Sequence, residues 1–227
     1  MKVCKTAIAV VVFVALGMSI DPARGSTIFL STTSTNPALT NPAAQGARGD
    51  LDLNPALWER AGVKATRPAA VLVPVVDRPE PAVLLTLRTE LPSHPGQIAF
   101  PGGKIDPHDR TPADAALREA REEIGLGPAL IEPIGYLDLY LTFSGYRILP
   151  TVARVRPDYQ LVLCEAEVAD AFEVPLAFLM DAQNHALHSR DWKGIERKYY
   201  AMPFGERYIW GVTAGILRNL YERIYQV

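Results

Sequence analysis

The pattern of hydrophobic and polar positions divides the chain into short strands and helices. Continuous apolar runs between turn residues predict strands, and apolar residues at helical spacing predict helices. We expect helices at residues 53–61, 112–124, 168–172 and 212–224, and strands at residues 69–76, 82–87, 97–100, 134–142, 146–155, 198–202 and 208–210. Residues 77–81, which read DRPEP, predict a hairpin connection. Strands on both sides of a helix, with antiparallel connections, favour an α+β layered domain.

The helix at residues 112–124 has well-marked ends. Thr111 is a suitable N-cap, Pro112 occupies the first helical position, and Gly125 suits the left-handed conformation after the last turn. A stripe of apolar residues on this helix is expected to face the core: Ala113, Leu117, Ala120 and Ile124.

Three carboxylates gather on the other side of this helix. Glu119, Glu122 and Glu123 fall within an arc of roughly 100° and repel one another. A divalent cation would turn this repulsion into attraction, and carboxylate oxygens suit Mg²⁺ or Mn²⁺ better than zinc. A solvated acidic face is the alternative interpretation. The Gly102-Gly103 turn before the helix favours a ligand site, because its backbone can approach a ligand closely.

Composition limits the classes of function. The chain has 227 residues, of which 48% are hydrophobic and 21% charged, as in ordinary globular proteins. Its net charge of −2 gives no strong field that would favour nucleic acid. The two cysteines, Cys4 and Cys164, are too few for a disulfide framework or a cysteine zinc site.

The first 50 residues differ from the rest. Lys2 and Lys5 precede an apolar run at residues 7–18, about 12 residues long, which fits a signal-peptide core but is too short to span a bilayer. We therefore expect no stable membrane association. Two alternatives stay open: residues 1–25 are a signal peptide and the protein is exported, or translation starts at Met18 or later and the protein is cytoplasmic. The polar composition of residues 26–50 predicts a disordered linker before a domain at residues 51–227.

Residues 103–126 read GKIDPHDRTPADAALREAREEIGL and resemble the Nudix box, G-x5-E-x7-R-E-U-x-E-E-x-G-U, in which U is aliphatic. The matching positions are Gly103, Arg118, Glu119, Glu122, Glu123, Gly125 and Leu126. Asp109 replaces the first Glu of the box, one extra residue precedes Arg118, and Ala120 is small for the aliphatic position.

The segments LLTLRT at residues 84–89 and HPGQIAFPGG at residues 94–103 resemble a second signature, that of the coenzyme A pyrophosphatase-like Nudix branch. The Asp and the extra residue in the box are similar to that branch too. One position departs from it, because Pro92 stands where the branch usually has an Arg.

The resemblance implies a Nudix-type α/β/α sandwich with a mixed central sheet and a requirement for Mg²⁺ or Mn²⁺. It implies that Glu119 and Glu123 are metal ligands, that Glu122 is a third ligand or the base that activates water, and that a backbone carbonyl at Gly102 or Gly103 completes the shell. Arg118 would orient a ligand Glu. Expected substrate contacts are Arg88, Lys104 and His94, and a further carboxylate could come from Glu165, Glu167 or Glu173. Tyr208 and Trp210 are expected to lie in the core rather than to stack against a nucleotide base.

The implied activity is hydrolysis of the pyrophosphate bond of coenzyme A or its derivatives, which gives adenosine 3′,5′-bisphosphate and (acyl-)4′-phosphopantetheine. Pro92 keeps open a second small-molecule substrate class, nucleoside diphosphate derivatives such as ADP-ribose or a dinucleotide cofactor. A third alternative is an inactive binding domain, against which the complete set of box glutamates argues. A homodimer is one assembly that the sequence allows.

Overall fold

The computed structural model describes residues 18–20, 28–30, 47–62, 64, 66–89, 96–192 and 194–225. Its strands are β1 (Met18–Ile20), β2 (Ile28–Leu30), β3 (Arg48–Gly49), β4 (Arg67–Val76), β5 (Ala82–Arg88), β6 (Ile98–Ala99), β7 (Gly102–Lys104), β8 (Ile131–Tyr136), β9 (Tyr140–Leu141), β10 (Tyr146–Val155), β11 (Val168–Pro175), β12 (Ala186–Trp192), β13 (Ile195–Phe204) and β14 (Arg207–Trp210). Its helices are α3 (Asp50–Leu53), α4 (Pro55–Ala61), α5 (Pro112–Ile124), α6 (Leu176–Leu179) and α7 (Val212–Tyr225), with 3-10 turns at Pro128–Leu130 and Ala182–Asn184.

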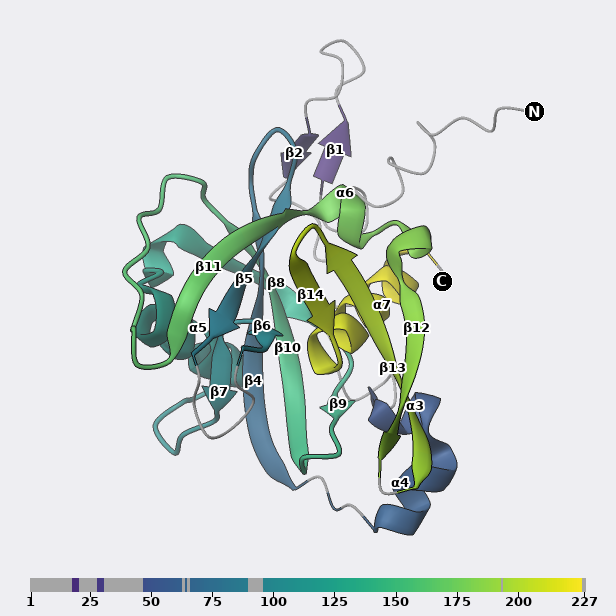
Figure 1. The fold of residues 1–227 in the computed structure, drawn as a ribbon. Helices are drawn as coiled ribbons and strands as arrows, with labels where there is room; N and C mark the ends of the chain where they lie inside the picture. The colour runs from purple at the N-terminus through teal and green to yellow at the C-terminus, as the bar shows by residue number, and fades with distance from the viewer. Residues whose placement is uncertain are drawn as a thin grey trace, which may run out of the picture.

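A mixed sheet forms the centre of the fold (Figure 1). Its strand order is β11-β5-β4-β10-β9-β3, with β6, β7 and β8 paired to β5, β4 and β10. The long strands β4 and β10 run parallel, whereas β4 and β5 form the antiparallel hairpin predicted around residues 77–81. A separate antiparallel sheet contains β12, β13 and β14.

Helices cover both faces of the central sheet (Figure 1). On one face, Ala116, Ala120 and Ile124 of α5 pack against apolar side chains of β4 and β5. On the other face, α7 contributes Ile216 and Leu217 to a core that also holds β4, β5 and residues of the small sheet. The expected α+β sandwich with a mixed central sheet is therefore confirmed.

Several predicted elements differ from the structure. The expected short helix at residues 168–172 is wrong, because this segment belongs to β11 and pairs antiparallel with β5 at the edge of the sheet. The expected strand at residues 134–142 is divided into β8 and β9, and the register of β8 against β10 shifts at Val152 and Ala153. The hairpin strand β12 was missed, since its sequence ALHSRDW is largely polar.

The boundary of the predicted linker also differs in part. Residues 48–50, which we placed in the linker, form β3 and begin α3, and β3 pairs in parallel with β9. β1 and β2 pair antiparallel with each other. The rest of the predicted export signal and linker lies outside the described residues. Within the part of the chain that is described, no helix has the length and apolar character needed to cross a membrane.

Candidate active site

The ends of α5 are built as the sequence predicts. The Thr111 hydroxyl accepts a hydrogen bond from the backbone N–H of Asp114 at 3.1 Å, and Gly125 adopts φ of 69° after the last turn. The buried face is rotated relative to the expected stripe. Ala115 and Ala116 are fully buried together with Ala120 and Ile124, whereas Ala113 and Leu117 are only partly buried. This rotation turns the side of α5 that carries Glu123 into the protein.

Glu123 is a buried carboxylate, with only 4% of its side chain exposed. Its Oε2 accepts a hydrogen bond from the backbone N–H of Gly102 at 3.1 Å, and its Oε1 lies 3.9 Å from Nη1 of Arg88. Burial raises the pKa of Glu123 to about 7, and the nearby charges of Glu119 and Glu167 act in the same direction. The hydrogen bond from Gly102 and the charge of Arg88 oppose this rise without cancelling it.

Glu119 lies one turn earlier and is directed at the Gly102–Lys104 strand. A Cβ atom at Gly103 would come within 2.5 Å of its Cδ, so the missing side chain of Gly103 makes the space for this carboxylate. The pKa of Glu119 is raised, mainly by burial, although Arg118 donates a hydrogen bond to it at 3.0 Å. Glu119 and Glu123 are thus two partly or fully buried acids next to Gly103 and Gly102 of β7.

Arg118 organises the more exposed part of the site. Its guanidinium donates to both carboxylate oxygens of Asp109 at 3.1 and 3.0 Å, and to Glu119 and Glu122 at 3.0 Å each. It also donates to the backbone carbonyl of Lys104 at 3.0 Å. The bonds from Arg118 lower the pKa of Asp109, whose side chain is 6% exposed. Asp109 therefore anchors the arginine, while Glu122 is 58% exposed and accepts a hydrogen bond from Arg118.

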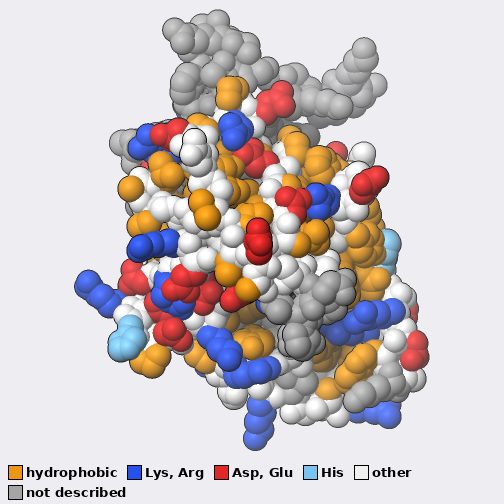
Figure 2. All heavy atoms as spheres, turned by 60° about the vertical axis from the view of Figure 1, so that its left-hand side comes forward, with side chains coloured by type: hydrophobic (Ala, Val, Ile, Leu, Met, Phe, Trp, Pro, Cys, Tyr) orange, Lys and Arg blue, Asp and Glu red, His pale blue; other side chains and the backbone are white. Residues whose placement is uncertain are grey.

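The acidic side of α5 opens onto a cleft of about 710 Å³. Figure 2 shows acidic and basic side chains gathered next to one another on this face of the molecule. The cleft is lined by these predicted residues: Arg88, Gly103, Lys104, Glu119, Glu122 and Glu123. Its volume falls within the range of small-molecule sites. The structure thus brings together the expected residues, with the exception of His94, which lies outside the described residues.

Of the three candidates for a further carboxylate, only Glu167 lines the cleft. Glu173 forms a separate cluster, because Arg78 donates to its two oxygens at 2.8 and 2.7 Å and the Tyr159 hydroxyl donates to it as well. Arg78 lowers the pKa of Glu173. Glu165 is exposed and is not part of the cleft lining.

The far wall of the cleft was missed by sequence reasoning. It comes from the small sheet and from the turn before β10, and its residues are Phe143, Ser144, Arg190, Arg197 and Trp210. Trp210, which we expected in the core, borders the cleft, and Tyr208 is 39% exposed. No local sequence pattern predicts this wall, because its residues come from segments that are far apart in the sequence. The charged and aromatic residues that occur together in β12 and β13 were a weak signal, and they did not identify the wall.

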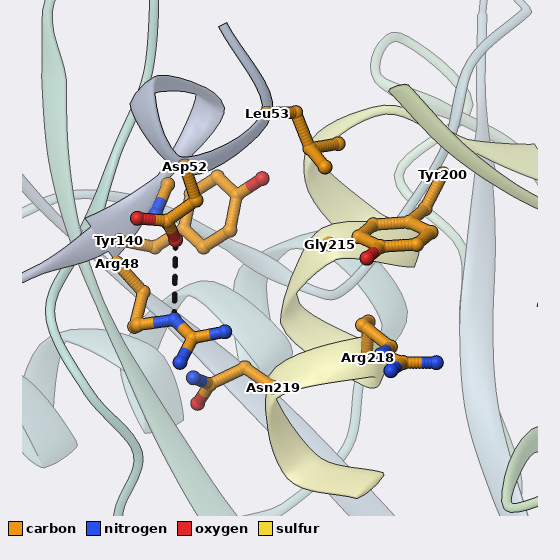
Figure 3. Close-up of a pocket in the computed structure, with 9 residues that line it drawn as sticks. Arg48, Asp52, Leu53, Tyr140, Tyr200, Gly215, Arg218 and Asn219 are labelled. Carbon is orange, nitrogen blue, oxygen red and sulfur yellow. Dashed lines mark hydrogen bonds and ion pairs between the residues drawn. The ribbon is translucent and has the colours of Figure 1, made fainter. Parts of the chain in front are cut away.

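A second cavity is much smaller, at about 40 Å³, and lies between α3 and α7 (Figure 3). Arg48 reaches Asp52 there at 3.1 Å, and Tyr140, Gly215 and Asn219 complete part of the wall (Figure 3). This volume suits water rather than a nucleotide.

Comparison with known proteins agrees with this architecture. The NUDIX domain family model matches residues 66–197. An Escherichia coli K12 protein named Uncharacterized Nudix hydrolase NudL is 39% identical over 159 residues, which cover 70% of this chain and 83% of the relative. The chain therefore belongs to the Nudix hydrolase family, and it is an enzyme that hydrolyses a substrate with a pyrophosphate bond. Nudix hydrolases generally need divalent metal ions.

Solved structures are similar at lower sequence identity. DR0079 from Deinococcus radiodurans has a TM-score of 0.47 and 13% identity, with 70% of this chain and 85% of that chain covered. The Ap4A hydrolase of Caenorhabditis elegans has a TM-score of 0.42 and 20% identity, with 48% and 80% covered.

Proposed function

We propose that this protein hydrolyses the pyrophosphate bond of coenzyme A or its derivatives, with adenosine 3′,5′-bisphosphate and (acyl-)4′-phosphopantetheine as products. The observation that carries the proposal is one cleft in which Glu119 and Glu123 meet the cationic groups Arg88 and Lys104. Arg88 and Gly103 also belong to the two segments that resemble the coenzyme A branch. Carboxylates beside cations suit a substrate whose phosphates are bound partly through a divalent cation.

The donor set fits Mg²⁺ or Mn²⁺. Glu119 and Glu123 supply carboxylate oxygens next to Gly102 and Gly103, and the raised pKa of Glu123 reflects a buried carboxylate that lacks enough positive charge around it. Among the described residues, no group of three or more Asp, Glu, His or Cys side chains is close enough together to hold a metal ion. Glu122 is turned toward Arg118 instead. When bound, the ion would offset the charge that develops on the phosphate oxygens.

The residues of the chain itself have distinct tasks in this proposal. Arg118 fixes the positions of Glu119 and Glu122, and Asp109 in turn fixes Arg118 through two hydrogen bonds. Glu122 is exposed to the cleft and is able either to accept a proton from the attacking water or to add a third ligand oxygen. Arg88 contributes positive charge at the phosphates.

Product analysis on a substrate panel tests the proposal. The panel contains coenzyme A, acetyl-coenzyme A, ADP-ribose, a reduced dinucleotide cofactor and nucleoside triphosphates, each with and without Mg²⁺ or Mn²⁺. We expect release of adenosine 3′,5′-bisphosphate that depends on the metal ion, with coenzyme A species preferred. Preference for ADP-ribose or dinucleotides would replace the coenzyme A assignment with the second substrate class. Cleavage of none of these compounds would contradict the proposal.

Substitution of Glu122 tests the role of the helix. Because Glu122 is largely exposed and its side chain is hydrogen-bonded to Arg118 alone among the described residues, Glu122→Gln should keep the fold while it abolishes turnover. Glu80→Gln is the matched control, since Glu80 is an exposed glutamate in the β4–β5 connection outside the cleft. Circular dichroism and thermal unfolding establish folding for both variants. Wild-type turnover in Glu122→Gln would refute the role given to α5.

A further inference from the structure

Two arginines face each other on the far wall of the cleft. Arg190 of β12 lies directly opposite Arg197 of β13 in the antiparallel register. Residues opposite one another share a face of the sheet, and two like charges in this arrangement destabilise the pair. Both side chains line the cleft that also contains Glu119 and Glu123. The pair is therefore an unfavourable concentration of positive charge that opens onto the candidate active site.

The positive charge of this pair is only partly balanced. Arg197 lies 3.2 Å from the buried carboxylate of Asp50, which also accepts a hydrogen bond from the backbone N–H of Phe143 at 2.9 Å. Arg190 forms no ion pair with a carboxylate among the described residues. The acidic neighbours of the two arginines along the strands, Asp191 and Glu196, point to the opposite face of the hairpin by strand alternation. The ion pair with Asp50 therefore offsets one of the two positive charges, and the charge of Arg190 remains on this wall of the cleft.

Both guanidinium groups are held against aromatic rings. The Cζ atom of Arg190 lies 5.1 Å from the ring centre of Trp210, and that of Arg197 lies 4.7 Å from the ring centre of Phe143. This contact restrains an arginine side chain while its N–H donors, which lie in the guanidinium plane, stay available for hydrogen bonds. Two restrained arginines are the arrangement that recognises a phosphate group with several hydrogen bonds.

We propose that Arg190 and Arg197 form a subsite for a phosphomonoester on the nucleotide half of the substrate, separate from the pyrophosphate that is cleaved. The substrate class is then a nucleoside diphosphate derivative that carries an additional phosphate on its ribose. This inference rests on the proposed function, since coenzyme A carries such a group and its nucleotide product is adenosine 3′,5′-bisphosphate. ADP-ribose has no phosphomonoester, so the subsite would discriminate between the two substrate classes.

Binding of nucleotide fragments tests the subsite without turnover. Isothermal titration calorimetry compares adenosine 3′,5′-bisphosphate with 5′-AMP on the full chain, in buffer with chelator. The ligands differ by one phosphate, and a charge-assisted contact predicts that the wild type binds the bisphosphate about tenfold more tightly or better. In Arg190→Gln the ratio of the two dissociation constants should fall to about one, mainly through weaker binding of the bisphosphate.

Two variants control the experiment. Arg190→Lys keeps the charge but not the planar fork, and it should retain part of the preference. Arg156→Gln changes an exposed arginine that pairs with Asp158 outside the cleft, and it should behave like the wild type. Since Arg190 has an unfavourable neighbour in Arg197, Arg190→Gln should unfold no earlier than the wild type.

The possible outcomes separate the two proposals. Equal affinity of the wild type for both fragments, or an unchanged ratio in Arg190→Gln, overturns the subsite even if coenzyme A is cleaved. A wild-type preference that Arg190→Gln removes supports the subsite, and it does so even if the substrate panel yields no coenzyme A cleavage, which would overturn the proposed function alone.

Discussion

The adjacent glycines Gly102 and Gly103 of β7 allow one substitution to be compared at two neighbouring positions. In Gly103→Ala, the new Cβ would lie 2.5 Å from Cδ and 2.7 Å from Oε2 of Glu119. Carbon atoms pack at about 3.5 Å, so the Glu119 carboxylate would have to retreat by roughly 1 Å. The obstructing atoms are the end of a flexible side chain, and the movement disturbs the site rather than the backbone.

In Gly102→Ala, by contrast, the new Cβ would meet the backbone of β4. It would lie 2.5 Å from the carbonyl oxygen of Ala70 and 2.6 Å from Cα of Val71. Both residues belong to the long central strand, which pairs with β10 over its whole length and cannot withdraw locally. We therefore expect Gly102→Ala to lower the free energy of unfolding by about 2–4 kcal/mol.

The two substitutions should therefore affect different quantities. A displacement of about 1 Å in a catalytic group is able to reduce the rate by about 100-fold, equivalent to about 2.7 kcal/mol of transition-state stabilisation. Gly103→Ala should thus lower kcat/KM by about that factor and change the free energy of unfolding by less than about 1 kcal/mol. Urea unfolding and steady-state kinetics at saturating Mg²⁺ measure the two effects on the same preparations. Wild-type kcat/KM in Gly103→Ala, or a loss of stability as large as in Gly102→Ala, would refute this reasoning.

Three further predictions concern charged residues. Burial raises the pKa of Glu123 from 4.5 to about 7, so between these two pH values the folded protein holds a proton that the unfolded chain releases. Without metal ions, the free energy of unfolding should therefore fall by up to about 3 kcal/mol as the pH rises from 4.5 to 7. Urea titrations at pH 5 and pH 8 should show that Glu123→Gln lacks this fall, and an equal fall in both proteins would contradict the assignment. Arg118→Gln leaves the Asp109 carboxylate without its two donors, so we expect unfolding to become easier by about 1–3 kcal/mol and kcat to drop; unchanged urea midpoints would argue against the anchoring role. Arg78→Ala removes the partner of Glu173 outside the cleft. It should lower the free energy of unfolding, measured by thermal unfolding, by about 1 kcal/mol or less and leave kcat/KM unchanged. A loss of activity would instead indicate that Glu173 belongs to the active site.

Local signals explain which parts of the fold were predictable. The capping residue Thr111, the terminal Gly125 and a regular apolar spacing define α5 without reference to the rest of the chain. The β4–β5 hairpin and α7 are predicted for the same reason. The segment of β11 was misread because Val168, Ala171 and Phe172 have helical spacing, whereas pairing with β5 decides its conformation. That pairing joins residues 80 to 93 positions apart in the sequence, so a short window of sequence does not reveal it.

The site was predictable in its residue types but not in its environments. The arc of Glu119, Glu122 and Glu123 follows from helix geometry, yet their exposures range from a buried Glu123 to an exposed Glu122. This difference depends on the position of the Gly102–Lys104 strand against the helix. The pairing of Asp109 with Arg118 depends on the path of the loop between them, and the arginines of the far wall depend on the register of β12 and β13.

The charge distribution of the cleft explains why its acidic end is poorly balanced by the protein alone. Arg118 is already engaged by Asp106, Asp109, Glu119 and Glu122, so its charge is shared among four carboxylates. Among the described residues, Glu123 receives one backbone N–H and an arginine at 3.9 Å, and its pKa remains raised. A buried carboxylate with so little compensation reduces stability, and apolar packing on both faces of the sheet offsets this loss. The arrangement therefore opposes stability at the residues that we propose as cation ligands. A bound cation would relieve this repulsion, and it would also attract the phosphate groups of a substrate.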